Sequence, residues 1–207
     1  MSVAVAAVVV IVAVLDRLVG EPPARVHPVV WFGRLVALVD REWQHPRIVG
    51  TLAAVTLPLV AAAVAGGAIW LAGFVHPVAG AGVAVGVLFS STSLRLLSET
   101  AREVIALSET DLPRAREELL ALAGRDASDL SADLVRSAAV ESAAENLSDG
   151  LVAPLSAFGG VAVVASLSGW AGPMLPVAAA AAAWIKAVNT IDSMLGYRSK
   201  PVGWAGA

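Results

Sequence analysis

Three carboxylates stand at regular spacing directly before a long uncharged segment. Glu141, Glu145 and Asp149 are spaced by four residues, so a helix that persists this far would place them on one face. Like charges at this spacing cost about 0.2–0.5 kcal/mol per pair, and a helix C-terminus beside a membrane disfavours anions further. These costs favour a compensating cation, and Mg²⁺ held by carboxylates and nucleotide phosphates fits. The alternative, which the spacing leaves open, is a solvated acidic face paired with Arg102 or Arg136.

A second group of polar side chains follows the last uncharged segment. Lys186, Asn189 and Asp192 recur every three residues along one side of a helix end, with Tyr197 and Arg198 close behind. For Lys186 alone, the ordinary explanation is an ammonium group that extends from an apolar helix toward water. A cation, an amide and a carboxylate together favour a binding site.

Three further residues are weaker candidates. Asp16 ends the uncharged N-terminal segment, where acids are common. His27 precedes a proline, and a lone histidine is more often a structural hydrogen-bonding group than a catalyst. Arg125 can bind a phosphate or carboxylate through two parallel hydrogen bonds, with a surface ion pair to Asp126 as the alternative.

Several kinds of site are excluded. The glycines of a P-loop precede neither Lys186 nor Lys200, and G-x-S-x-G and H-E-x-x-H do not occur. The chain has no cysteine, which removes thiolate metal sites and cysteine nucleophiles. A net charge of −3 without a basic patch argues against a nucleic-acid partner. Any nucleotide would therefore be held outside the Walker architecture.

The elements that must position these residues are apolar. The 207 residues are 57% hydrophobic and 15% charged, whereas soluble domains are about 45–50% apolar and about 25% charged. Residues 48–94 and 150–185 contain no Asp, Glu, Lys or Arg. This pattern indicates an integral membrane protein.

We expect an all-α fold and a single membrane domain over residues 1–207, with about five transmembrane helices. Prolines divide the two long uncharged runs, at Pro77 and Pro173. The first fifteen residues lack the basic start of a secretory signal, so they are taken as a retained span. The predicted spans are about 1–15, 50–72, 78–94, 151–168 and 174–190.

The distribution of positive charge predicts the orientation. With the N-terminus outside, the segments 16–47, 95–149 and 191–207 face one side, and Lys186 lies at the mouth of the last span on that side. All 14 Lys and Arg residues are then on this side, which the positive-inside rule makes the cytoplasm. We expect a multi-pass protein of the cell membrane whose site faces the cytoplasm.

The segment 95–149 carries most of the charge and is predicted to be helical. Pro113 suits a first helical turn, and Gly124 suits a C-terminal stop. Ser131 suits an N-cap, with Asp133 in the first turn of a helix that reaches about Leu147.

Together, these stretches resemble the adenosylcobinamide-phosphate synthase family of cobalamin biosynthesis (CobD/CbiB). They follow the family's order across nearly the whole chain, and the two longest are specific. The matching runs are LDRLVGEP at 15–22, HPV at 27–29 with Gly33-Arg34, GRD at 124–126, VESAAENLSDGLVAP at 140–154 and KAVNTIDSMLGYR at 186–198.

The resemblance implies an enzyme that joins adenosylcobyric acid to aminopropanol or its phosphate. The bond is an amide on a propionate side chain of the corrin ring, driven by ATP. Because a carboxylate is a poor electrophile, it must first be activated, for example as an acyl phosphate. The implied cofactors are ATP and Mg²⁺. The implied partners are the corrinoid, the amine, membrane lipid, and a second copy of the chain or other proteins of the pathway.

The resemblance also suggests roles for individual residues. Mg²⁺ on the face formed by the three spaced carboxylates would hold and polarise the nucleotide. Lys186 would neutralise phosphate charge, and Asp192 or His27 would take the proton that the ammonium loses. The residues expected to bind substrate or phosphate are Arg125, Asn189, Asn146, Tyr197 and Asp16.

One departure from the family and two alternatives stay open. Family members continue past the stretch 203–205 with a further helical part, so that part is expected to be missing from this chain, as a truncation or in a shortened relative. The main alternative is a non-catalytic AmpE-like membrane sensor, which retention of both acidic runs disfavours. A transporter would need charged or broken-helix residues at mid-bilayer, and the predicted spans contain only Pro58 and Pro154 of this kind.

Overall fold

The computed structural model describes residues 3–124, 126–196 and 201–202. All regular structure in these ranges is helical, which confirms the predicted fold class. The elements are α1 (Val3–Val19), α2 (Pro28–Ala37), α3 (Pro46–Val75), α4 (Pro77–Ser91), α5 (Leu94–Thr110), α6 (Leu112–Ala123), α7 (Ala132–Leu147), a π-helical turn η1 (Ser148–Val152), α8 (Ala153–Leu167) and α9 (Met174–Leu195).

Four helical stretches are long and apolar enough to cross a membrane. They are Pro46–Val75, Pro77–Thr110, Ala132–Leu167 and Met174–Leu195, of which the second joins α4 to α5 and the third joins α7 to α8. Helix α1 has 17 residues, about 25 Å at 1.5 Å per residue, against a hydrocarbon core of about 30 Å. A fifth span at the N-terminus therefore stays a prediction.

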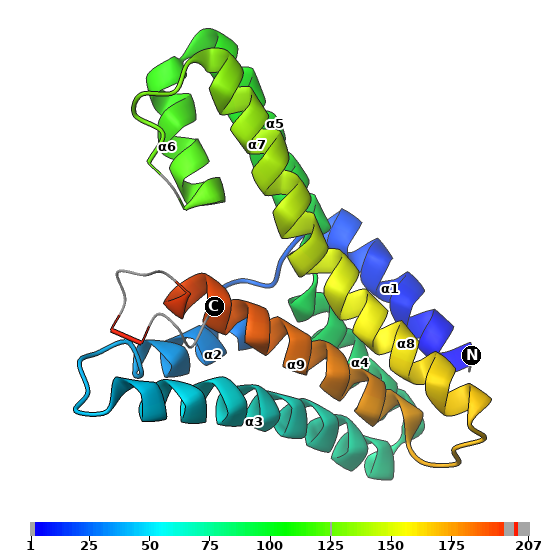
Figure 1. The fold of residues 1–207 in the computed structure, drawn as a ribbon. Coiled ribbons are helices and arrows are strands. Elements are labelled where there is room, and N and C mark those ends of the chain that lie inside the picture. Colours follow the sequence, from blue (N-terminus) through cyan, green and yellow to red (C-terminus); the bar gives the residue numbers. More distant parts are fainter. Residues whose placement is uncertain (1–2, 125, 197–200, 203–207) are drawn as a thin grey trace.

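The bundle has two chemically different ends (Figure 1). The N-terminus and the turns α3–α4 and α8–α9 lie at one end, while α2, the start of α3 and the end of α9 lie at the other. Because residues 48–94 and 150–185 carry no Asp, Glu, Lys or Arg, we call these the uncharged end and the charged end.

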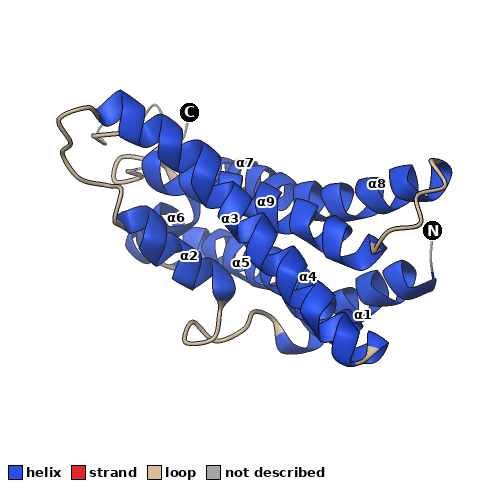
Figure 2. Cartoon of the chain, turned by 90° about the horizontal axis from the view of Figure 1, so that it is seen from below, coloured by secondary structure: helices blue, strands red, loops and turns tan. Residues whose placement is uncertain are grey.

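Small residues allow the helices of the bundle to pack closely. Helix α9 lies between α3 and α8 (Figure 2). A Cβ atom on Gly66 of α3 would lie 3.1 Å from the carbonyl oxygen of Pro176 in α9, and one on Gly80 of α4 would lie 3.1 Å from Gly73. Side chains of α1, α4, α8 and α9 fill the rest of the core, including Val8, Leu88, Phe158 and Ala182.

Helices α5, α6 and α7 project from the bundle as a separate layer (Figure 1), which we call the arm. The arm has its own hydrophobic core around Val104 and Leu119. Its boundaries confirm the sequence prediction: Gly124 ends α6 in a left-handed conformation with φ of 63°, and the Ser131 hydroxyl accepts the N–H of Leu134 at the start of α7.

Each of the chain's three histidines precedes a proline and begins a helix. The Nδ1 atom of His27 accepts the N–H of Val29 at 3.3 Å, and Nδ1 of His76 accepts the N–H of Val78 at 3.2 Å. His45 occupies the same position before α3 without a side-chain hydrogen bond to the helix. The following proline suits the first helical turn because it lacks an N–H that would need a partner.

Candidate functional site at the charged end of the bundle

The junction of α7 and α8 is built around a proline. Pro154 has no N–H, so the carbonyl of Gly150 four residues earlier loses its helical partner. The N–H of Ser93 donates to that carbonyl at 3.0 Å. A Cβ atom on Gly150 would lie 3.1 Å from the Ser93 hydroxyl oxygen, so a larger residue would crowd this contact. The π-helical turn η1 lies just before the proline, where a wider turn accommodates the ring.

This junction separates the three spaced carboxylates. Glu141 and Glu145 are exposed on α7, whereas Asp149 is half-buried in η1 and interacts electrostatically with Asp192 on α9. In an α-helix, a residue four positions later lies about 40° farther around the helix axis. Asp149, eight positions after Glu141, would therefore lie about 80° from it even in a regular helix without η1. Asp149 therefore lies in different surroundings from Glu141 and Glu145.

A metal site built from protein side chains alone needs several ligands close together. Among the described residues, no three Asp, Glu or His side chains form a group that could hold a metal ion. Among these residues the three-carboxylate Mg²⁺ site is thus not assembled. Binding of Mg²⁺ by a smaller set of ligands stays a prediction.

Lys186 lies at the centre of the charges that the fold gathers at this end. It is partly buried on α9 and interacts electrostatically with Glu21 from the α1–α2 segment and with Asp149 from η1. His27 is also within its electrostatic range, and Asp192 lies farther along α9, within range of Asp149. We call this set the polar cluster; its members are Glu21, His27, Asp149, Lys186 and Asp192.

His27 is held in place from both of its ring nitrogens. It is 7% exposed, Nδ1 accepts the N–H of Val29, and Nε2 lies 3.9 Å from a carboxylate oxygen of Glu21. Burial lowers the pKa of His27 below its usual 6.5, while Glu21 opposes this shift and Lys186 adds to it. A neutral imidazole with its proton on Nε2 satisfies this geometry, so neither nitrogen offers a free lone pair.

Glu21 is a member that the sequence did not single out. The helix α1 ends where Gly20 adopts φ of 81°, a conformation that suits glycine, and Pro22 follows at once. The chain therefore turns sharply and carries Glu21 toward α9. A carboxylate fixed between a helix stop and a proline is a signal in the sequence that could have identified it.

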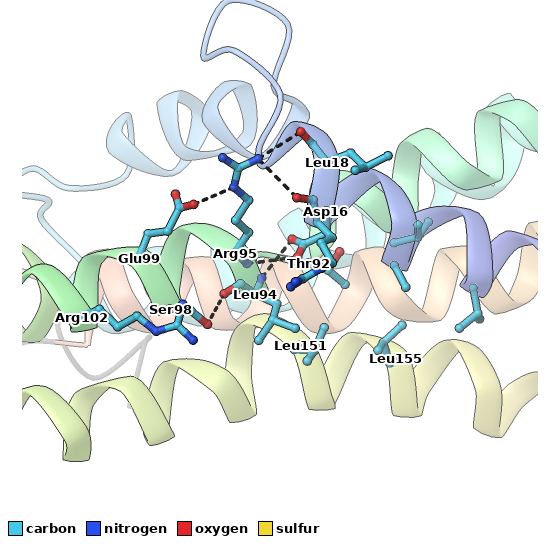
Figure 3. A pocket seen from close by; sticks show the side chains of 14 residues that line it. Asp16, Leu18, Thr92, Leu94, Arg95, Ser98, Glu99, Arg102, Leu151 and Leu155 are labelled. Atoms are coloured by element: carbon cyan, nitrogen blue, oxygen red, sulfur yellow. Dashed lines mark hydrogen bonds and ion pairs between the residues drawn. The ribbon is translucent and has the colours of Figure 1, made fainter.

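Asp16 has a structural explanation (Figure 3). Its two carboxylate oxygens accept the N–H groups of Leu94 and Arg95, each at 3.1 Å, and so cap the start of α5. In return, the Arg95 guanidinium donates to the carbonyl of Leu18 at 3.0 Å at the end of α1. Asp16 is buried and is not part of the polar cluster. Its predicted contact with substrate stays a prediction.

The other predicted residues are distributed as follows. The amide of Asn146 donates to the Leu122 carbonyl of α6 at 3.2 Å, which ties α7 to α6. Asn189 is half-buried on α9, one helical turn beyond Lys186. Arg125 and Tyr197 lie outside the described residues.

A cavity of about 380 Å³ adjoins the polar cluster. Helices α2, α3, α4 and α9 enclose it, and its lining is mainly apolar, including Trp31 and Phe32, with Lys186 at the edge that it shares with the cluster. A cation beside apolar walls can bind an anionic group attached to a hydrophobic body, and the neighbouring carboxylates can accept a proton.

The fold and the cluster define a class: an all-helical protein with four helices able to span a membrane and a charged site at one end of the bundle. The chain belongs to the CobD/CbiB family, because the family described as CobD/Cbib protein matches residues 9–207.

Individual relatives agree with this family. A cobalamin biosynthesis protein CobD of Geobacter metallireducens is 38% identical over 97% of this chain and 61% of its own length. A cobalamin biosynthesis protein CbiB of Salmonella typhi is 38% identical over 89% and 56%, and a probable CobD of Pyrococcus abyssi is 33% identical over 89% and 57%. The chain thus spans about three fifths of the curated relatives it matches. No solved structure matches it.

Proposed function

We propose that this chain acts in cobalamin biosynthesis, in the step that joins adenosylcobyric acid to aminopropanol or its phosphate through an amide bond. The observation that carries the proposal is the polar cluster, because it brings together residues from four of the five runs on which the family resemblance rests. The names of the relatives support the pathway. The amide-forming reaction rests on the resemblance and on the chemistry of the cluster.

Lys186 is the residue that we expect to bind the acidic reactant. Amide formation requires that the negative charge of a carboxylate or phosphate be neutralised before an amine attacks. The ammonium of Lys186 lies between the cluster and the apolar cavity, where partial burial strengthens its attraction for an anion. The apolar cavity would accommodate a hydrophobic portion of the reactant.

Asp192 is the preferred proton acceptor. An incoming ammonium must lose a proton to become a nucleophile, and a carboxylate within reach can take it. Asp192 is exposed and interacts electrostatically with Asp149. His27 is less suited to this step because both of its ring nitrogens face partners. We assign His27 the role of a positioning residue for Glu21.

The residues present also fit a nucleotide with Mg²⁺. Such sites need only one or two protein carboxylates, because phosphate oxygens and water complete the coordination. Asp149 provides one such carboxylate beside Lys186, which would face the phosphates, and Asp192 stays available as the proton acceptor. ATP would supply the activation of the carboxylate when bound. Glu141 and Glu145, which lie on the exposed face of α7, are not needed for this arrangement.

The membrane location follows the same proposal. The Lys and Arg residues within the described ranges belong to segments at the charged end or in the arm, so the positive-inside rule favours a cytoplasmic location for this end. We propose the cell membrane as the location, with the polar cluster open to cytoplasmic reactants.

The test is amide formation by the chain in isolated membranes. Membranes from a synthase-deficient strain expressing the chain are given adenosylcobyric acid, aminopropanol or its phosphate, ATP and Mg²⁺, and the corrinoid product is measured by mass spectrometry. Lys186→Met should lower the rate about 100-fold or more. The matched control is Arg47→Met, which removes an exposed cation from the same end of the bundle.

Two results would contradict the proposal. Membranes that contain the chain but form no product with either amine would leave the non-catalytic alternative. A Lys186→Met variant with the rate of the unaltered chain would remove Lys186 from the reaction.

A further inference from the structure

A second, larger cavity lies away from the polar cluster. It has a volume of about 830 Å³ and is enclosed by α1, α5 and the η1–α8 segment (Figure 3). None of the five members of the polar cluster lines it. We call this cavity the groove.

The groove has an apolar part and a cationic part. The apolar part is formed by Val12 and Ala13 of α1 and by Leu151 and Leu155 on the other side. The cationic part is formed by arginines in the last turn of α1 and on α5 of the arm. These are Arg17, Arg95 and Arg102.

Two of the arginines have charge available for a ligand. Arg95 is engaged, because its Nε lies 2.8 Å from Glu99 and its guanidinium also donates to the Leu18 carbonyl. Arg17 and Arg102 are exposed and form no ion pair within the described ranges. The Asp16 carboxylate is already hydrogen-bonded by two backbone N–H groups. The groove therefore presents two unpaired guanidinium groups above an apolar channel.

This combination matches one ligand chemistry. A phosphate group binds guanidinium strongly and in a directed manner, and an acyl chain suits the apolar part, which lies on α1 and α8. The segments 1–15 and 150–185 are uncharged, so the apolar part extends into the layer where acyl chains lie. A soluble phosphate compound would use the arginines and leave the apolar channel without a partner.

We propose that the groove is a binding site for an anionic phospholipid of the surrounding bilayer. Its phosphate lies at Arg17 and Arg102, and one acyl chain follows the apolar part between α1 and α8. The proposal is independent of the reaction at the polar cluster, since the two sites share no lining residue.

The test is lipid binding to the purified full chain in detergent, measured by native mass spectrometry. Phosphatidylglycerol should bind at least tenfold more tightly than phosphatidylcholine with the same acyl chains. The double variant Arg17→Gln/Arg102→Gln should weaken phosphatidylglycerol binding about 25-fold, or about fivefold per arginine. The matched control is Arg25→Gln/Arg47→Gln, which removes two exposed arginines outside the groove and should change binding less than twofold.

A second pair of variants tests the apolar part. Ala13→Trp fills the channel and should weaken binding of phosphatidylglycerol at least fivefold. Ala7→Trp, on the same helix but outside the groove, should not change it.

Three results would overturn the proposal. The first is equal binding of phosphatidylglycerol and phosphatidylcholine to the unaltered chain, a result that does not depend on the folding of any variant. Binding that is insensitive to the Arg17→Gln/Arg102→Gln change would place the lipid elsewhere. Displacement of the lipid by ATP, lost in that same double variant, would assign the groove to a soluble phosphate compound.

Discussion

The turns at His27–Pro28 and His76–Pro77 begin helices in the same way but have different surroundings. In both, Nδ1 accepts the N–H two residues ahead, at 3.3 Å and 3.2 Å. His27 is buried beside Glu21 and within electrostatic range of Lys186. His76 is exposed at the uncharged end. The His-Pro motif thus explains the helix cap at both turns. Only the turn at His27 can take part in a reaction, because distant segments bring charged side chains to it.

The largest expected effect comes from removing one of those charges. Asp149→Asn should lower amide formation about 100-fold, because Asp149 interacts electrostatically with Lys186 and Asp192. Glu145→Gln should change the rate less than threefold, since Glu145 is exposed on α7. Initial rates in membranes with equal amounts of chain measure both. Equal losses would restore the predicted single acidic face and contradict the separation by η1.

The two histidines can be compared directly with a substitution that retains a cap. Asparagine is a good N-cap residue, so His27→Asn and His76→Asn both preserve the start of a helix. His27→Asn should lower the rate about tenfold, because Glu21 loses the imidazole that positions it. His76→Asn should stay within twofold. The pH profile of the rate should shift in His27→Asn only, which a purely structural role would not produce.

Removal of the cap itself should affect stability at both turns. His76→Ala should lower the free energy of unfolding by about 1 kcal/mol, the usual value of an N-cap interaction, without an effect on the rate. Thermal unfolding in detergent, followed by circular dichroism, measures this change. If His76→Ala unfolds at the same temperature as the unaltered chain, the hydrogen bond to Val78 contributes nothing.

The smallest expected effect is a pH dependence of stability. The pKa of His27 is lower in the folded protein than its usual 6.5, so the unfolded chain binds the proton more strongly. Stability should therefore fall as the pH drops below about 6.5. This slope should be shallower in His27→Asn and unchanged in His76→Asn. Unfolding temperatures between about pH 7 and pH 5 measure it, and an identical slope in all three chains would contradict the burial of a neutral His27.

The sequence predicts features that depend on neighbouring residues. Gly124 and Ser131 mark the end of α6 and the start of α7, as expected from their turn and capping preferences. The helical class follows from the apolar segments in the same way. These features need no information from distant parts of the chain.

Other features depend on residues that are far apart in the sequence. The start of α5 is capped by Asp16, 78 positions earlier than Leu94, and no local pattern indicates that contact. The direction of Asp149 depends on Pro154 and on the donor that Ser93 supplies to Gly150. Helical spacing alone therefore predicted one acidic face. In the structure, Glu141 and Glu145 are exposed on α7, whereas Asp149 is half-buried in η1. Glu21 is marked locally only by the Gly20 helix stop and by Pro22, and its partners come from His27 before α2 and from Lys186 on α9.

The hydrogen bonds by which Asp16 caps the start of α5 and Arg95 binds the end of α1 have a mechanical consequence. The arm meets the bundle where Thr92 and Ser93 interrupt the helix, and its tilt is held there by Asp16 on one side and by the Gly150 carbonyl on the other. Helix α5 has 17 residues, a lever about 25 Å long. A rotation of about 10° at this joint would displace the far end of the lever by about 4 Å. These hydrogen bonds, together with the helical connection from α7 through η1 to α8, thus set the position of the side chains at the tip.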